Sequence, residues 1–159
     1  MKIHYLTIDP GISGTGYALW SSPHWELMKT GIYSVSSDKV TWEHKGHIIA
    51  QNIAILCRNY SVRKICIEFP AYFDSSSGNM VAKRGDSVKL TWMVGMICGI
   101  VYPLKPVLVP VNNWKGQMPK DVVIRRIQKR LGVERCEELG IKSHMWDSVG
   151  VGLFASGKF

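Results

Sequence analysis

Hydrophobic residues in the first 35 positions gather in short runs that polar and glycine-containing segments separate. The runs cover Ile3–Ile8, Thr15–Trp20 and Leu27–Val35. Runs of this length, bounded by turn residues, are typical of β-strands. Because the segments between them are short, we expect an antiparallel meander of three strands, with Asp9-Pro10-Gly11 forming the first turn.

The hydrophobic period changes after residue 44. Apolar residues between Lys45 and Tyr60 recur with helical spacing and share one face, which predicts a helix. Arg63–Phe69 returns to a strand pattern and stops at Pro70. The next segment, Ala71–Gly85, is rich in Ser and Gly, and we expect it to be a mobile loop.

The second half of the chain alternates between helical and extended patterns. We expect a helix over Asp86–Val101, with Asp86 as its N-cap, and then a strand over Pro106–Val111. A polar connection over Asn112–Gln117 leads to a helix from Pro119 to Leu131. A last helix follows Ser143 as N-cap and runs nearly to Phe159. This order predicts a mixed α/β sheet, antiparallel in its first three strands and parallel afterwards, with helices on both faces. Residues 1–159 are expected to form a single domain.

Composition narrows the class of protein. Hydrophobic residues make up 46% of the chain and charged residues 20%, which excludes a disordered protein. Twenty Lys and Arg against twelve Asp and Glu give a net charge of +8. This excess favours a polyanionic partner such as nucleic acid, although an ordinary basic protein explains the charge alone equally well.

The cysteines and the apolar segments indicate a compartment. None of the four Cys residues has CxxC spacing, so the sequence supports no zinc site, and reduced cysteines suit the cytoplasm. The chain begins without a long apolar signal region. Leu90–Val101, the most apolar stretch, is too short to span a bilayer. We therefore expect a cytoplasmic protein without a membrane partner.

Three acidic residues lie in apolar surroundings. Asp9 ends the first predicted strand, Glu68 nearly ends the fourth, and Asp147 lies in the first turns of the last helix. Carboxylates that converge at one sheet edge repel each other, and a divalent cation removes that repulsion. Oxygen ligands of this kind suit Mg²⁺ or Mn²⁺. Taken singly, the three residues are better explained as a turn residue, a solvated strand end and a helix-dipole partner, and the functional interpretation rests on the set.

A histidine and a group of basic residues accompany these acids. His144 precedes Asp147 by three residues and shares its helix face, so it is a candidate fourth metal ligand or general base; the alternative is a surface histidine beside the cap. Basic residues are concentrated in the segment 115–130, and Lys83, Arg84 and Lys89 form a second group around the start of the central helix. We predict that both contact phosphates, the alternative being a solvated helix face. The candidates in these groups are Lys83, Arg84, Lys89, Lys120, Arg125, Arg126 and Lys129.

The ordered motifs resemble the RuvC family of Holliday junction resolvases. Ile8-Asp9-Pro10-Gly11 with Thr15-Gly16-Tyr17 resembles the family's opening, and Ile67-Glu68 its second acidic position. Gly85-Asp86-Ser87-Val88-Lys89-Leu90 is similar to the start of its central helix. Trp114-Lys115-Gly116-Gln117 with Pro119-Lys120 looks like the lysine-bearing segment of phage-type members, and His144-Met145-Trp146-Asp147-Ser148 like the last acidic motif.

The resemblance implies a ribonuclease H-like fold and a dimeric endonuclease that cleaves branched DNA with two Mg²⁺ or Mn²⁺ ions. Asp9 would bridge the ions, and Glu68 and Asp147 would each hold one. Lys115 would neutralise charge on the scissile phosphate, although its position alone equally fits a solvated lysine. His144 stands where many members have Asp and some have His. If the source is a phage, the compartment is the bacterial host's cytoplasm.

In the bacterial members an aromatic residue soon after the second acid stacks in the opened junction. Phe69 is the direct counterpart, with Tyr72 and Phe73 as rivals. The apolar helix from Asp86 is the expected dimer contact, the alternative being a helix buried within a monomer. Three other functions stay open: a phosphate-binding loop of the sugar-kinase type, for which the chain is too short, a non-catalytic DNA-binding module, and a nuclease that acts on flaps, forks or RNA–DNA hybrids.

Overall fold

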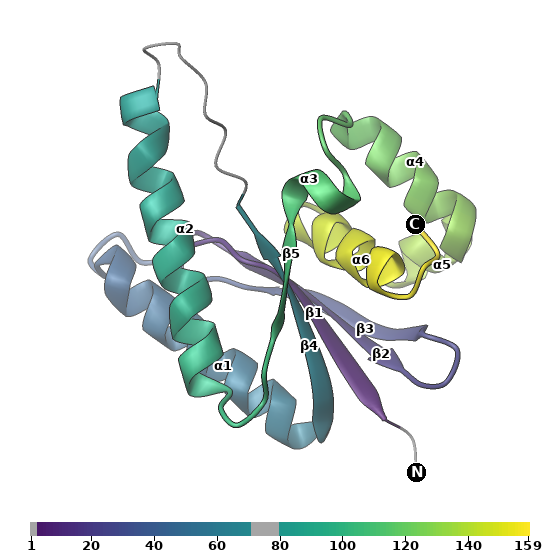
Figure 1. The fold of residues 1–159 in the computed structure, drawn as a ribbon, viewed down its shortest axis with the longest axis horizontal. Coiled ribbons are helices and arrows are strands. Elements are labelled where there is room, and N and C mark those ends of the chain that lie inside the picture. The colour runs from purple at the N-terminus through teal and green to yellow at the C-terminus, as the bar shows by residue number, and fades with distance from the viewer. Residues whose placement is uncertain (1–2, 71–79) are drawn as a thin grey trace.

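A five-stranded sheet forms the centre of the molecule (Figure 1). The computed structural model describes residues 3–70 and 80–159, with side chains for 3–70 and 85–159. The strands are β1 (His4–Asp9), β2 (Thr15–Ser21), β3 (Glu26–Tyr33), β4 (Val62–Phe69) and β5 (Val107–Pro110), in the spatial order β3-β2-β1-β4-β5. The first three strands are antiparallel, and β4 and β5 continue the sheet in parallel with β1, as predicted.

The register of the parallel strands sets up the functional edge. Ile8 of β1 lies opposite Ile67 of β4. The next residues, Asp9 and Glu68, therefore lie at the same height at the carboxyl ends of adjacent strands. Glu68 in turn lies opposite Val109 of β5. The carboxyl ends of parallel strands are where open α/β sheets bind their ligands.

Helices cover both faces of the sheet, as predicted, and bury a separate apolar core on each (Figure 1). The helices α1 (Trp42–Asn59) and α2 (Met80–Ile100) pack together on one face. The helix α6 (His144–Ala155) lies on the other face, under α4 (Lys120–Leu131). Two short helices, α3 (Val111–Trp114) and α5 (Val133–Glu138), complete the chain.

Small residues allow α6 to lie close to the sheet. A Cβ at Gly152 would stand 2.3 Å from the ring of Trp20, and one at Gly16 of β2 would stand 2.2 Å from the carbonyl oxygen of His144. A buried hydrogen bond also fixes the orientation of α6 on β1, because Thr7 Oγ1 donates to the carbonyl of Ser148 at 2.7 Å. The first turn of α6 is therefore held against the ends of β1 and β2.

Several predicted boundaries were wrong. Helix α2 begins at Met80, so residues 80–85 are helical rather than part of a loop, and Asp86 is an interior residue instead of an N-cap. Helix α1 begins at Trp42, where Thr41 accepts a hydrogen bond from the His44 backbone N–H. The first turn of α1 is largely polar, so the apolar periodicity that indicated a helix from Lys45 did not reach it.

Other differences lie in the second half of the chain. The predicted polar connection 112–117 begins with α3, and α5 was missed because Cys136 is its one fully buried residue. Ser143 precedes α6 as predicted, but its side chain makes no capping hydrogen bond. The third strand ends at Tyr33 rather than Val35, and α6 ends at Ala155, before Gly157 with its positive φ of 72°.

Within residues 3–70 and 80–159, every helix is too short or too polar to cross a membrane.

We predict that Gly16→Ala will destabilise the protein by about 2 kcal/mol, because the added methyl group would overlap the His144 carbonyl and push α6 off the sheet. Urea unfolding monitored by circular dichroism measures the loss. Gly85→Ala is the matched control, because a Cβ there meets nothing within 4 Å and alanine favours a helix. Equal stability of the two variants would contradict the close approach of α6.

Candidate functional site

The three predicted acids meet at one edge of the sheet, in a cleft of about 600 Å³. Asp9 and Glu68 come from the ends of β1 and β4, and Asp147 reaches the same place from the first turns of α6. Lys115 and His144 line the same cleft. The structure thus brings together all five residues that the sequence proposed for catalysis, from four segments spread between positions 9 and 147.

Asp9 and His144 form the first pair of this site. Asp9 is only 7% exposed, and its Oδ2 atom lies 2.8 Å from His144 Nδ1. Burial raises the pKa of Asp9, and the charge of Asp147 adds to that effect. The hydrogen bond to Asp9 raises the pKa of His144, so the imidazole is favoured in its charged form beside the carboxylate.

Glu68 is held by the segment that follows β5. Trp114 Nε1 donates to Glu68 Oε2 at 3.0 Å, and Lys115 Nζ donates to the same oxygen at 3.4 Å. The indole fits closely over α6, because a Cβ at Gly150 would lie 2.4 Å from its ring. Burial, followed by the charge of Asp9, raises the pKa of Glu68 to about 7. Glu68 therefore holds a proton far more readily than an ordinary glutamate.

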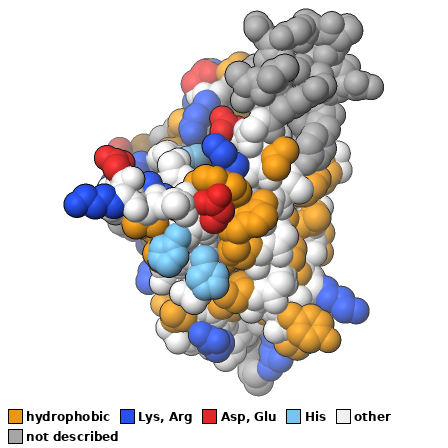
Figure 2. Space-filling view, turned by 90° about the vertical axis from the view of Figure 1, so that its left-hand side faces the viewer, with side chains coloured by type: hydrophobic (Ala, Val, Ile, Leu, Met, Phe, Trp, Pro, Cys, Tyr) orange, Lys and Arg blue, Asp and Glu red, His pale blue; other side chains and the backbone are white. Residues whose placement is uncertain are grey.

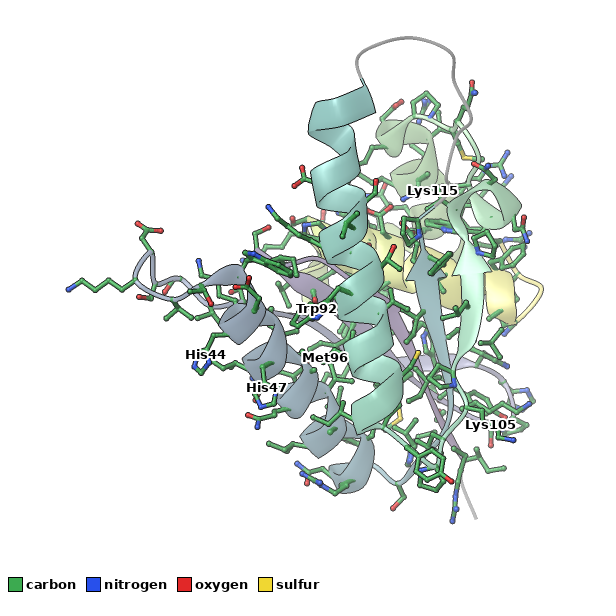
Figure 3. All side chains as sticks on the ribbon, turned by 60° about the vertical axis from the view of Figure 1, so that its left-hand side comes forward. His44, His47, Trp92, Met96, Lys105 and Lys115 are labelled. Atoms are coloured by element: carbon green, nitrogen blue, oxygen red, sulfur yellow. The ribbon has the colours of Figure 1, made fainter. Side chains whose placement is uncertain are left out.

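Two lysines bind Asp147. Lys115 Nζ donates to Asp147 Oδ1 at 2.7 Å, and Lys120 Nζ donates to Oδ2 at 3.3 Å. Burial lowers the pKa of Lys115, but the charges of Glu68 and Asp147 outweigh that effect and raise the pKa above its usual value. The Lys115 ammonium thus bridges two acids at the centre of the site. Figure 3 shows it at the end of the sheet where the α3 segment begins.

The donor set fits a hard divalent cation. Three carboxylates and one imidazole are ligands that Mg²⁺ or Mn²⁺ accepts. Neighbouring carboxylates add to the raised pKa values of Asp9 and Glu68, so added positive charge is favourable there. As the side chains stand, no three His, Cys, Asp or Glu residues in the described part of the chain are close enough to share one ion. Lys115 supplies the positive charge between Glu68 and Asp147 in this arrangement.

The residues predicted to bind DNA have varied surroundings. Phe69 is partly buried against the α1–α2 core. Lys89 pairs with Asp86 at 3.7 Å, and Arg125 pairs with Asp121 at 2.7 Å. These contacts do not test a role in DNA binding, which stays a prediction.

The remaining candidates for DNA binding fall into three groups. Arg126 lies over the Phe159 ring at 5.7 Å, and with Lys129 and Arg130 it lines a hollow of about 260 Å³. Tyr72, Phe73, Lys83 and Arg84 lie outside the residues whose side chains the structure describes. Lys120, predicted as a DNA contact, lies in the acidic site itself.

The structure adds residues that sequence patterns did not single out. Trp114 appeared only within a motif, yet its indole is the hydrogen-bond donor to Glu68. A tryptophan next to a lysine in a polar connection was the available signal. Trp42 and Lys45 of α1 line the same cleft as the acids, and only the packing of α1 against α2 brings them there.

Comparison with known proteins gives matches in structure and none in sequence. No protein-family model matches the chain, and no curated protein matches it. RuvC of Thermus thermophilus, in complex with a Holliday junction substrate, superposes with a TM-score of 0.72 at 14% sequence identity, covering 95% of this chain and 90% of that one. The chain has the RuvC fold.

Two further solved structures have the same fold as this chain. A second structure of Thermus thermophilus RuvC gives a TM-score of 0.63 at 13% identity, covering 98% of both chains. The yeast mitochondrial Holliday junction resolvase Ydc2 gives 0.59 at 13% identity, covering 97% of this chain and 78% of that one. The likeness confirms the predicted ribonuclease H-like α/β fold across nearly the whole chain.

We predict that the protein without divalent cations loses stability as the pH rises from 5 to 8. The pKa of Glu68 is about 7 in the folded state against 4.5 for an ordinary glutamate, so between these values the folded state binds more protons than the unfolded state. By linkage, raising the pH through this window destabilises the fold, by roughly 3 kcal/mol for this shift. The raised pKa values of Asp9 and His144 act in the same direction.

Urea unfolding in chelator at several pH values measures this effect. Glu68→Gln should flatten the profile, because the titrating group is gone. Stability that is constant or rises between pH 5 and pH 8 would contradict the described burial of Glu68.

We predict that Lys115→Met destabilises the metal-free protein by about 2 kcal/mol at pH 8, because Glu68 and Asp147 lose the cation between them. The loss should shrink at pH 5, where Glu68 is protonated. Thermal unfolding at the two pH values gives the comparison. Lys129→Met, which removes an exposed lysine, should stay within about 0.5 kcal/mol at both. A loss that does not depend on pH would assign Lys115 a packing role instead.

Proposed function

We propose that this protein is a metal-dependent endonuclease that cleaves branched DNA, with four-way junctions as its substrate. The observation that supports this most strongly is the convergence of Asp9, Glu68 and Asp147, with Lys115, in one cleft at the carboxyl ends of the parallel strands. Buried like charges of this kind are costly and are typical of functional sites. The net charge of +8 suits a polyanionic substrate.

The RuvC fold adds to this proposal. The Thermus thermophilus RuvC structure with a TM-score of 0.72 was determined with a Holliday junction substrate, and Ydc2 is named as a Holliday junction resolvase. One fold can host many functions, so the proposal rests mainly on the residues of the cleft, and the shared fold is additional support.

Asp9, Glu68, His144 and Asp147 would hold two Mg²⁺ or Mn²⁺ ions. Bound metal ions activate water and stabilise the leaving oxygen in phosphodiester hydrolysis. Asp9 would contact both ions, as the resemblance to the RuvC family implies. His144 Nδ1 lies 2.8 Å from Asp9 Oδ2, so a role for His144 as ligand or base falls on Nε2 or requires this hydrogen bond to break.

Besides pairing with the acids, Lys115 would contact the substrate in this proposal. Its ammonium lies between Glu68 and Asp147 and would exchange these carboxylates for a phosphate oxygen of the substrate. A cation placed beside the scissile phosphate offsets the charge that develops during hydrolysis. Lys89, Arg125, Arg126 and Lys129 are exposed or half-buried at the surface and would contact the phosphate backbone.

We infer that the working form is a homodimer joined through α2. Gly95 and Gly99 leave open space where a Cβ would stand, and Val88 is 64% exposed on the same helix. Small residues let two helices approach closely. A four-way junction offers two equivalent strands, and a two-fold enzyme matches that symmetry.

Cleavage of a synthetic, end-labelled four-way junction tests the proposal. We expect paired nicks across the junction in Mg²⁺ or Mn²⁺, no cutting in chelator, and at least a 100-fold slower reaction for Asp147→Asn. Asp121→Asn is the matched control, because Asp121 is an exposed acid paired with Arg125 on α4, and it should cut at the normal rate.

The alternatives give different results on the same gel. Equal or faster cutting of a fork or flap would move the protein to a broader class of structure-specific nucleases. Binding without cutting of any substrate would make it a DNA-binding module with structural acids. Full activity of Asp147→Asn would overturn the proposed site.

A further inference from the structure

The cleft that holds the acids has a second wall of different chemistry. The lining also includes Trp42 and Lys45 of α1 and Asp86, Lys89 and Leu90 of α2. Figure 2 views the molecule from the α1 and α2 side, where hydrophobic side chains gather in the middle of the face with charged and histidine side chains beside them. The mechanism proposed above uses none of the α1 residues.

Packing with α2 fixes the position of Trp42. Its ring meets Trp92 edge-on, with centroids 5.0 Å apart and planes at 75°. Figure 3 shows Trp92 on α2 between the two helices. Gly46 makes room for this pair, because a Cβ there would stand 2.6 Å from the Trp92 ring. Trp42 itself stays only half-buried and lines the cleft, so the chain presents a positioned aromatic ring there.

Two ammonium groups accompany this ring. Lys89 Nζ lies 5.9 Å from the Trp42 ring centroid. Its ion pair with Asp86 is weak, because the Asp86 side chain is 82% exposed and the distance is 3.7 Å. Lys45 lines the same wall and has no ion pair within the described residues. An aromatic ring with two available cations is the combination that binds a base and its phosphates.

We propose that Trp42, Lys45 and Lys89 form a subsite for one unpaired nucleotide of the substrate strand, with the base stacked on the indole and the phosphates on the two ammonium groups. The inference rests on the proposed function and adds that the DNA strand enters the cleft with one nucleotide unpaired. A cleft of about 600 Å³ has the size of pockets that take a small-molecule-sized group and is too small to enclose a duplex. The subsite therefore selects DNA whose pairing is already disturbed, as at a branch point.

Junctions that carry 2-aminopurine at each position next to the branch point test the stacking. Chelator prevents cleavage during the measurement. We expect wild-type protein to quench 2-aminopurine at one of these positions, Trp42→Leu to lose the quenching and to bind about tenfold more weakly, and Trp42→Phe to keep part of both. Trp25→Phe is the matched control, because Trp25 stacks on Tyr5 near the β2–β3 turn, at the opposite end of the sheet.

The salt dependence of junction binding tests the two cations. Lys45→Gln and Lys89→Gln should each reduce the slope of log affinity against log salt by about one. Lys64→Gln is the matched control, because Lys64 is exposed near the start of β4, far from the cleft. These variants remain informative if Trp42→Leu fails to fold, which thermal unfolding detects.

The outcomes separate the subsite from the proposed function. Wild-type protein that binds and cuts junctions, with Trp42→Leu quenching and binding as wild type does, would overturn the subsite alone. Weaker binding by Trp42→Leu with unchanged quenching would assign Trp42 a structural role and also overturn it. Wild-type protein that binds no branched DNA would overturn the proposed function and the subsite together.

Discussion

The burial of three carboxylates at one sheet edge is the constraint on which the rest of this structure depends. Asp9 and Asp147 are each less than a tenth exposed, and the charge of Asp147 adds to the raised pKa of Asp9. An unpaired buried charge is strongly destabilising. The protein offsets this cost with cations from three different segments: Lys115 after α3, Lys120 at the start of α4, and His144 at the start of α6. The conflict is compensated and not removed, because the pKa values of Asp9 and Glu68 remain raised.

Small residues in and beneath α6 make this compensation possible. Gly16 lets the first turn of α6 reach the end of β2, which brings His144 to Asp9 and Asp147 into the cleft. Gly150, one turn further along, leaves room for the Trp114 ring, which in turn donates to Glu68. A single helix therefore supplies one acid directly and supports the donor of another. Larger residues at these glycines would separate the acids from their partners while leaving the sheet itself in place.

The sequence predicted the parts of this arrangement whose signals are local. Apolar runs that end in Asp9 and Glu68 indicated both strands and both acids, and the pairing of β1 with β4 confirms that the two meet. Helix α5 was missed because its residues are mostly exposed, and the start of α2 was misplaced because Ser- and Gly-rich residues precede it. Lys115 was equally well explained as a solvated lysine; its distances to Glu68 and Asp147 show that it is paired with two acids, and its catalytic role stays a prediction. Such pairings depend on segments far apart in the chain, which periodicity cannot reveal.

The two walls of the cleft differ in how firmly their side chains are held, and this difference bears on substrate choice. On the acid wall, hydrogen bonds and ion pairs of 2.7–3.4 Å join the mostly buried carboxylates to their partners, so its geometry is set before a substrate arrives. On the opposite wall, the ion pair of Lys89 is 3.7 Å long and involves an exposed acid, and Lys45 has no ion pair within the described residues, so these side chains can adapt to a ligand. Hydrolysis requires a fixed geometry, whereas recognition of a distorted strand requires some freedom. Under the proposed function, the chemistry therefore belongs to the sheet and α6, and the choice among branched substrates to α1 and α2.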